Sequence, residues 1–286
     1  MEAARIMEVL ADASTSREEG IERLLSFMAP DGSRYFDSIY GSFFGRDAIA
    51  AWLVPTMAEI PFIDFRPTQE PVLLDDGEGG TSVDEWEMVA GDVSLGKGVS
   101  VRRYRGGFIT WACDVYDTGP FRRPGPNGET APLPAPPPLA DWPRHPGAPV
   151  TRARDVDFDR DCDQFHPTDS VYIDPIFGEF HGRAGIREWI TDVMPKCGDI
   201  EFVPVGPELA DARAYVQEWV QMAVLPDGAR VPMTRGTSVR RYREGSTVRA
   251  ADYFDTATVM APEVLAASIA CGSTIGADDI MRWRAR

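Results

Sequence analysis

The spacing of apolar residues changes along the chain from a helical period to a strand period. Residues 17–28 and 45–57 carry apolar side chains at helical spacing, and the second of these segments begins after a glycine. Apolar and polar residues then alternate over residues 81–90, 99–105 and 108–117, and a glycine pair separates the last two segments. Helices followed by an antiparallel meander predict an α+β fold.

The same order of elements occurs twice. The segment YFDSIYGSFFGRDAIAAWLVPTM from Tyr35 aligns with YIDPIFGEFHGRAGIREWITDVM from Tyr172, a displacement of 137 residues. Further on, SVRRYRGGFITWACDVYDTG from Ser100 aligns with SVRRYREGSTVRAADYFDTA from Ser238, a displacement of 138 residues. Two nearly equal displacements in segments so far apart indicate a duplicated domain.

The repeat predicts two domains, residues 1–120 and residues 151–286. Residues 121–150 are rich in proline and glycine and lack apolar periodicity, which predicts an extended linker of polyproline character. The segments PEVLAASIA and ADDIMRWRAR near the C-terminal end predict helices that have no counterpart in the first repeat. These helices are candidates to complete the second repeat, whose opening segment is short and polar.

Composition limits the classes of partner. With 43% hydrophobic residues the chain is predicted to be globular, and its formal net charge of -16 argues against nucleic acid, which requires a basic surface. No run of 18 apolar residues predicts a membrane span, and no export signal is recognised. Four scattered cysteines predict reduced thiols in a cytoplasmic protein. Without clustered metal ligands or a phosphate-binding glycine motif, the sequence predicts no metal and no cofactor.

Carboxylates occupy strand positions whose neighbours are apolar. Asp114 and Asp252 lie at equivalent places in the last strand of each repeat, in rows that the alternation predicts to be buried. Glu85 and Glu87 in the first repeat and Glu218 in the second lie in apolar rows of an earlier strand. We expect these acids to share a concave face, where their interactions separate a proton donor from a base. A structural role for one buried acid is the alternative.

A Tyr-x-Asp motif before the Gly-Arg helix, the spacing Gly-Arg-x-x-Ile-x-x-Trp and the closing DYFD together resemble the NTF2-like superfamily. The resemblance is strongest to its SnoaL-like polyketide cyclase and limonene epoxide hydrolase branches, and it covers most of both repeats. It implies two tandem cone-shaped α+β barrels, in which a curved antiparallel sheet wraps around helices and encloses an apolar pocket. It also implies cofactor-free acid–base chemistry.

In the epoxide hydrolase branch, a Tyr, an Asn and a last-strand Asp hold a water molecule, and an Arg-x-Asp pair serves the acid side. The resemblance assigns the tyrosine place to Tyr35 and Tyr172, the asparagine place to Asp37 and Asp174, and the aspartate place to Asp114 and Asp252. The Arg-x-Asp pair becomes Glu85-x-Glu87 in the first repeat and Glu218-x-Val220 in the second. The loss of the arginine argues against hydrolysis by that mechanism.

We therefore expect a cofactor-independent lyase that removes water or a small carbonyl such as formaldehyde from a hydrophobic, aromatic, hydroxylated small molecule. NTF2-like lyases that act on lignin-derived diarylpropane diols, in aromatic compound catabolism, illustrate this chemistry. The expected bases are Asp114 and Asp252, the expected hydrogen-bond donors Tyr35 and Tyr172, and the expected acids Glu85, Glu87 and Glu218. Isomerase, epoxide hydrolase and non-catalytic binding or association remain alternatives. We expect the repeats to pair as an internal pseudo-dimer, and a further homo-oligomer stays open.

Overall fold

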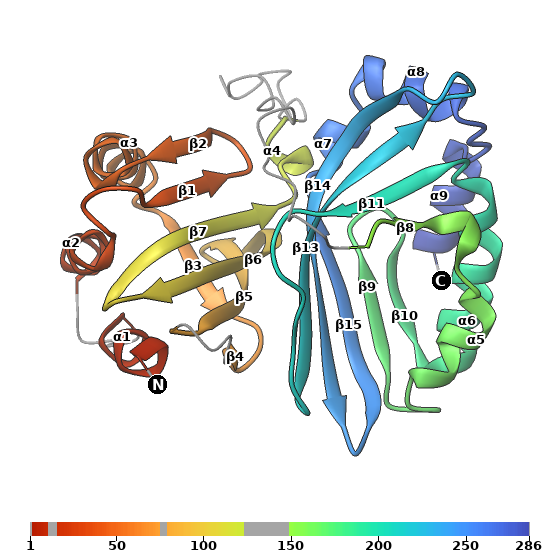
Figure 1. The fold of residues 1–286 in the computed structure, drawn as a ribbon. Helices are drawn as coiled ribbons and strands as arrows, with labels where there is room; N and C mark the ends of the chain where they lie inside the picture. Colours follow the sequence, from red (N-terminus) through yellow and green to blue (C-terminus); the bar gives the residue numbers. More distant parts are fainter. Residues whose placement is uncertain (1, 11–15, 75–78, 123–148, 286) are drawn as a thin grey trace. The chain divides into compact units, whose positions relative to one another are not determined.

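The computed structural model describes residues 2–10, 16–74, 79–122 and 149–285 (Figure 1). The chain forms two compact units, Met1–Pro137 and Pro138–Arg286. Most of the expected linker lies outside the described residues. Each unit combines one sheet with several helices, so the predicted α+β class is confirmed.

The first repeat contains four described helices and one sheet. The helices are α1 (Glu2–Leu10), α2 (Arg17–Phe27), α3 (Arg46–Glu59) and α4 (Gly119–Arg122). The strands are β1 (Arg34–Asp37), β2 (Gly41–Phe44), β3 (Ile63–Pro67), β4 (Val72–Leu74), β5 (Thr81–Ala90), β6 (Val93–Arg105) and β7 (Phe108–Tyr116). Their order is β2-β1-β7-β6-β5-β3, and β4 also pairs with β5. Because β1 runs parallel to β7, the sheet is mixed and not purely antiparallel.

The second repeat has the same strand order with one added edge strand. Its strands are β8 (Thr151–Arg152), β9 (Val171–Asp174), β10 (Gly178–His181), β11 (Ile200–Pro204), β12 (Leu209–Ala210), β13 (Ala214–Val224), β14 (Arg230–Arg243) and β15 (Ser246–Phe254). Its helices are α5 (Phe158–Asp161), α6 (Gly182–Val193), α7 (Thr256–Val259), α8 (Pro262–Ala270) and α9 (Ala277–Arg284), with 3-10 turns η2 (Ala153–Asp155), η3 (Cys162–Gln164) and η4 (Met194–Lys196). The order β10-β9-β15-β14-β13-β11-β8 matches the first sheet, which confirms the tandem repeat in the fold.

Local sequence accounts for the helix starts and the tight turns. Ser16 forms a capping box with Glu19 at the start of α2. Gly45 precedes α3 with a φ of 82°, a conformation that favours glycine. Gly106 and Gly107 join β6 to β7 with φ values of 57° and 85°. Each of these turns lies where the sequence pattern predicts one.

Helices pack on one face of each sheet, and we call this face the inner face. In the first repeat, Ile6 of α1 and Ile49 of α3 pack with Tyr35 and Ala112 of the sheet. In the second, the buried apolar residues of α6 and α9 pack with Ala250. All of these residues are buried, so the inner face carries the core of each repeat.

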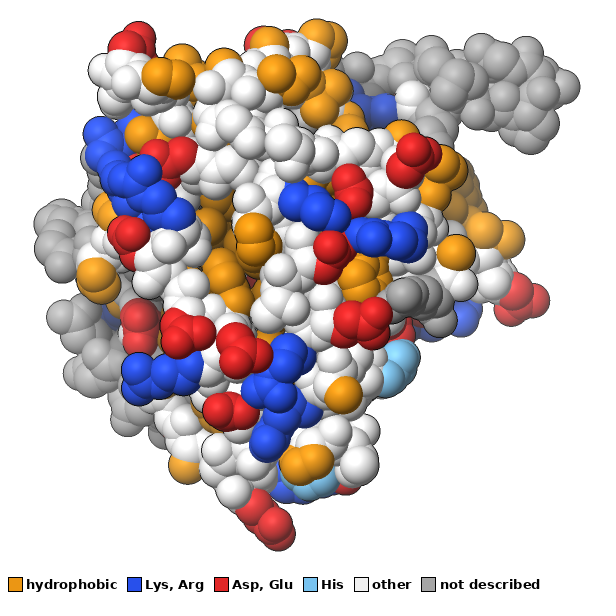
Figure 2. All heavy atoms as spheres, turned by 90° about the vertical axis from the view of Figure 1, so that its right-hand side faces the viewer, with side chains coloured by type: hydrophobic (Ala, Val, Ile, Leu, Met, Phe, Trp, Pro, Cys, Tyr) orange, Lys and Arg blue, Asp and Glu red, His pale blue; other side chains and the backbone are white. Residues whose placement is uncertain are grey.

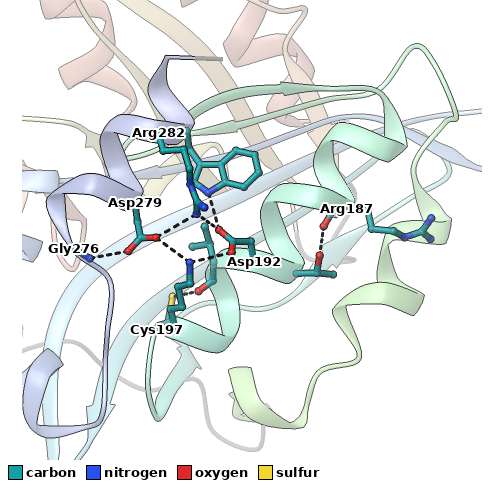
Figure 3. Close-up of polar contacts among 10 residues, drawn as sticks. Arg187, Asp192, Cys197, Gly276, Asp279 and Arg282 are labelled. Carbon is teal, nitrogen blue, oxygen red and sulfur yellow. Dashed lines mark hydrogen bonds and ion pairs between the residues drawn. The ribbon is translucent and has the colours of Figure 1, made fainter.

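The C-terminal helix α9 completes the second repeat. Trp283 is 5% exposed, contacts Phe180 edge to face at 5.8 Å and donates its Nε1 hydrogen to Asp192 of α6 at 3.0 Å. Figure 3 shows Asp192 facing α9. Lys196 Nζ lies 3.0 Å from Asp192 and 2.9 Å from Asp279 of α9. The predicted C-terminal helices are therefore present, and α9 adds a buried indole to a repeat that has only a short opening helix.

The surface of the second repeat over α6 and α9 carries basic and acidic side chains close together (Figure 2). Arg187 pairs with Asp163 at 2.7 Å, and Arg154 pairs with Asp199 at 2.8 Å. All four cysteines are free thiols. Within the described residues, every helix is too short or too polar to cross a membrane.

Candidate functional site

Strand register decides which of the predicted acids meet. Residues paired directly across two strands point to the same side of a sheet, and their chain neighbours point to the other side. Asp84 pairs with Ser100, and Ser100 pairs with Asp114, so these three side chains share one face. Glu85 pairs with Val99 and therefore lies on the opposite face.

The second repeat has the same register. Gln217 pairs with Ser238, and Ser238 pairs with Asp252. Glu218 pairs with Thr237, one residue out of phase with this row. The last-strand aspartates of both repeats thus lie on the inner face, while the neighbouring glutamates do not.

The prediction that Glu85, Glu87 and Glu218 face the last-strand aspartates is therefore wrong. Glu218 forms an ion pair with Arg235 at 2.9 Å, in which both side chains are only 2% exposed. Glu87 accepts a hydrogen bond from Ser94 Oγ at 2.5 Å. The error arose because these strands carry apolar residues on both faces, so that alternation alone did not identify the inner one.

Asp114 is the centre of a hydrogen-bonded group on the inner face of the first repeat. Tyr35 donates its hydroxyl hydrogen to Asp114 Oδ2, and Ser100 Oγ donates to Asp114 Oδ1 at 2.6 Å. Trp86 Nε1 donates in turn to Ser100 Oγ at 2.9 Å. Burial and the Asp114 charge raise the pKa of Tyr35 well above its ordinary value, so this phenol stays a hydrogen-bond donor.

Arg102 lies between two carboxylates on the same face. Its Nη1 is 2.8 Å from Asp84 Oδ2, and the two side chains are 18% and 20% exposed, so water reaches both. Burial alone would lower the pKa of Arg102, but the charges of Asp84 and Asp114 raise it above its ordinary value. Burial also raises the pKa of Asp84, against the opposing effect of Arg102. Neither Asp84 nor Arg102 is among the site residues predicted from the sequence.

Asp37 and Asp174 hold the turns that follow β1 and β9. Their Oδ1 atoms accept the backbone amides two and three residues later, at 2.7 and 2.9 Å for Asp37 and at 2.8 and 2.9 Å for Asp174. Burial raises the pKa of each carboxyl to about 7, although these amides act in the opposite direction. Tyr116 also donates to Asp37 at 3.0 Å, and Phe254 occupies its place in the second repeat.

The group around Asp252 reproduces that around Asp114. Tyr172 donates its hydroxyl hydrogen to Asp252 Oδ2 at 2.5 Å, and Ser238 Oγ donates to Oδ1 at 2.6 Å. Trp219 Nε1 donates to Ser238 Oγ at 2.9 Å. Burial raises the pKa of Asp252 despite these hydrogen bonds. The structure thus brings together the predicted tyrosine and last-strand aspartate of each repeat, and adds an unpredicted serine and tryptophan.

The two repeats differ in the charges beside this group. Gln217 stands where Asp84 stands in the first repeat, since each pairs with the serine of the next strand. Arg240, the counterpart of Arg102, has no carboxylate hydrogen-bonded to it among the described residues. Its guanidinium lies over the ring of Tyr215 at 5.5 Å from the centroid.

A glycine lies beneath each of the two tryptophans. A Cβ atom at Gly98 would lie 2.4 Å from the Trp86 ring, and one at Gly236 would lie 2.3 Å from the Trp219 ring. Carbon atoms do not approach this closely, so a side chain at either position would displace the indole. Glycine therefore keeps each tryptophan within reach of its serine.

Comparison with known proteins identifies part of the chain. Residues 151–250 match the family model of the SnoaL-like domain. A similar solved structure is that of a SnoaL-like family protein from Agrobacterium tumefaciens, with 20% identity, 41% of this chain and 97% of that chain covered, and a TM-score of 0.33. An NTF2-like protein of unknown function from Mesorhizobium loti has 20% identity, covers 41% of this chain and 91% of its own, and gives a TM-score of 0.33. A protein with a ketosteroid isomerase-like fold from Catenulispora acidiphila has 16% identity, covers 44% of this chain and 88% of its own, and gives a TM-score of 0.32. No curated protein sequence matches the chain. The resemblance drawn from sequence is confirmed over the matched residues, which lie in the second repeat.

Proposed function

We propose that the first repeat is a cofactor-independent acid–base lyase for a hydrophobic, aromatic, hydroxylated small molecule. One observation carries the proposal: two carboxylates in different environments, Asp84 and Asp114, flank Arg102 on the inner face. Asp114 accepts two hydroxyl hydrogen bonds, which orient its carboxylate as a base. Asp84, whose pKa burial raises, is suited to donate a proton.

The proposed elimination needs one base, one acid and a stabilising cation. Asp114 removes a proton from carbon, and the electron pair of that bond forms a double bond while the adjacent C–O bond breaks. Asp84 protonates the departing hydroxyl, which leaves as water. For a release of formaldehyde, Asp114 instead removes the O–H proton of a hydroxymethyl group. The electron pair of that O–H bond forms the carbonyl of formaldehyde, and the pair of the breaking C–C bond forms the double bond as the hydroxyl leaves. Arg102 stabilises the negative charge that develops between the two carboxylates.

Aromatic side chains next to these groups favour an aromatic substrate. Trp86 lies 5.6 Å from Tyr116 and 5.2 Å from Phe65, centroid to centroid. Tyr35 lies 5.2 Å from Trp52. Rings at these separations gain energy from offset or edge contacts, and a substrate ring would add to the same set.

The test is mass spectrometry of the purified protein, without added cofactor, against aryl and diaryl propanediols, epoxides, hydroxynaphthalenes and enones. Loss of water or formaldehyde, abolished by Asp114→Asn, is the expected result. An unchanged mass with an altered spectrum would instead establish an isomerase. Ligand-induced stabilisation without turnover of any compound would support a binding module and contradict the lyase.

Epoxide hydrolysis is the second candidate, and Arg102 is the observation that favours it. The sequence comparison placed acids where that mechanism has an arginine. The structure provides an arginine on the neighbouring strand, 2.8 Å from a second aspartate, Asp84. A gain of water by an epoxide in the same panel would establish this activity over the lyase.

A further inference from the structure

The inner face of the second repeat carries an arginine whose donors are not used by the protein. Arg240 is partly exposed, and its guanidinium lies over the ring of Tyr215, 5.5 Å from the ring centroid. Within the described part of the chain, its guanidinium makes no hydrogen bond. Arg102, at the equivalent position, already holds Asp84 at 2.8 Å. The guanidinium of the second repeat is therefore available to an external acceptor.

Register places this guanidinium beside the hydroxyl and carboxyl groups of the site. Arg240 pairs with Tyr215 on one side and with Ala250 on the other, and Tyr172 also pairs with Ala250. These side chains consequently share the inner face with Asp252, which lies two residues beyond Ala250. Arg240 belongs to the site itself and not to the outer surface of the repeat.

The nearby carboxylate of Asp252 is not hydrogen-bonded to Arg240. Asp252 uses Oδ2 for Tyr172 and Oδ1 for Ser238, at 2.5 and 2.6 Å. The charge of Asp252 raises the pKa of Arg240, but the hydrogen bonds of its carboxylate go to Tyr172 and Ser238. With Gln217 neutral, the second repeat holds one carboxylate per arginine in this row, whereas the first holds two. In this row the second repeat thus has one carboxylate fewer than the first, and the described residues leave the planar fork of donors of Arg240 without a hydrogen bond.

We propose that the inner face of the second repeat binds a small aromatic carboxylate through Arg240. A guanidinium matches the two oxygens of a carboxylate and binds them with charge-assisted hydrogen bonds. The ligand ring would pack with the aromatic residues Tyr215 and Trp219 of the same face. In the first repeat Asp84 occupies the arginine, so that site takes neutral ligands. The proposal does not depend on catalysis by the first repeat.

The test compares 2-naphthoate with its neutral analogue 2-naphthamide, titrated into the full chain by isothermal calorimetry. A hydrogen-bonded carboxylate–guanidinium contact is worth at least about 1.4 kcal/mol, so we expect about tenfold tighter binding of naphthoate, at one site per chain. Arg240→Gln should remove this preference. Gln217→Asp should also remove it, because the new carboxylate would occupy Arg240 as Asp84 occupies Arg102.

Arg243→Gln is the matched control, since Arg243 lies on the same strand but is 55% exposed in its side chain, and this variant should keep the tenfold preference. Equal affinity of the wild type for the two probes would overturn the proposal, as would a preference that survives Arg240→Gln. Circular dichroism checks that each variant is folded. Asp114→Asn should leave naphthoate binding unchanged, which separates a failure of this proposal from a failure of the lyase.

Discussion

The two repeats surround their last-strand aspartate with the same hydrogen-bond donors but with different charges. In both, a tyrosine and a serine donate to the carboxylate and a tryptophan donates to the serine. Among the described residues, the first repeat alone adds a second carboxylate, Asp84, paired with its arginine. Only the first also has Tyr116 donating to the carboxyl of the turn. The donors belong to the shared architecture, and the charges distinguish the two sites.

The hydrogen-bond donors common to both repeats can therefore be distinguished from the charged groups that differ between them. Donors that occur in both repeats orient a carboxylate whether or not it reacts. The acid and base of the proposed lyase require Asp84 as well as Asp114, and the second repeat has Gln217 at the former position. Variants that exchange or remove these groups test whether the difference between the repeats is a difference in function.

The largest expected effect is on turnover by the first repeat. Asp114→Asn should reduce kcat/KM by about 10³-fold, because general base catalysis contributes 10² to 10⁴. The matched variant Asp252→Asn should leave turnover of the same substrate within about twofold. Steady-state kinetics of both variants measures this, and equal losses would show that the two repeats do not differ in catalysis.

The next effect is on stability of the second repeat alone. Trp283→Ala should lower its free energy of unfolding by about 4 kcal/mol, since the buried indole is lost from the core. Met281→Ala on the same helix, 60% exposed, is the control and should change stability little. Calorimetry should show a lowered transition for the second repeat and an unchanged one for the first. Equal shifts in both would contradict the view that α9 completes only the second repeat.

A third effect concerns pH and should be alike in the two repeats. Asp37 and Asp174 have a pKa of about 7 in the folded chain against an ordinary value of 3.8. Folding therefore favours the protonated form, and stability decreases as pH rises from about 4 through 7. Asp37→Asn retains the oxygen that accepts the two amides but cannot ionise. The gain in free energy of unfolding of this variant over the wild type should be larger at pH 8 than at pH 5, by about 3 kcal/mol.

Asp174→Asn should give the same pH-dependent gain as Asp37→Asn. Denaturant unfolding between pH 5 and 8 measures both, and the exposed Asp31→Asn is the control that should show no such gain. A wild-type stability that does not fall over this pH range would disprove the assignment.

The smallest of the four effects makes the first repeat resemble the second. Asp84→Gln should reduce kcat/KM by roughly 10²-fold, at the lower end of general acid catalysis. Replacement by Asn of the exposed Asp92, in the turn between β5 and β6, should have no effect. Full activity of Asp84→Gln would exclude Asp84 as the proton donor and would leave Tyr116 as the main difference between the repeats.

The fold was predictable because the same sequence pattern of helices, turns and strands occurs in both repeats. Two pairs of matched segments revealed the duplication. Within each repeat, the helical spacing, the glycines at turns and the strand alternation predicted the order of elements. The tyrosine and last-strand aspartate also followed, since both belong to the repeated motifs. Pairing of the repeats as an internal pseudo-dimer stays a prediction.

The face of the remaining acids was not predictable, and a bulge explains why. The glycine turn alone would pair Arg103 with Thr110, but the register shifts between Arg103 and Tyr104, so that Arg103 pairs with Trp111. The shift moves every later residue of β7 by one position, and it places Ser100 opposite Asp114. Whether Asp84 or Glu85 meets Asp114 depends on this local irregularity, which hydrophobic periodicity does not reveal.

The chain of hydrogen bonds from indole to serine to aspartate has a consequence for tryptophan fluorescence. Trp86 is one hydroxyl away from Asp114, and Trp219 is one hydroxyl away from Asp252. A change in the charge of either carboxylate alters the electric field at an indole whose position a glycine fixes. Each repeat therefore contains its own fluorophore beside its reactive group. The chain has seven tryptophans, so the part of a ligand-induced emission change that is lost when one of these two is replaced with phenylalanine would show which repeat binds the ligand.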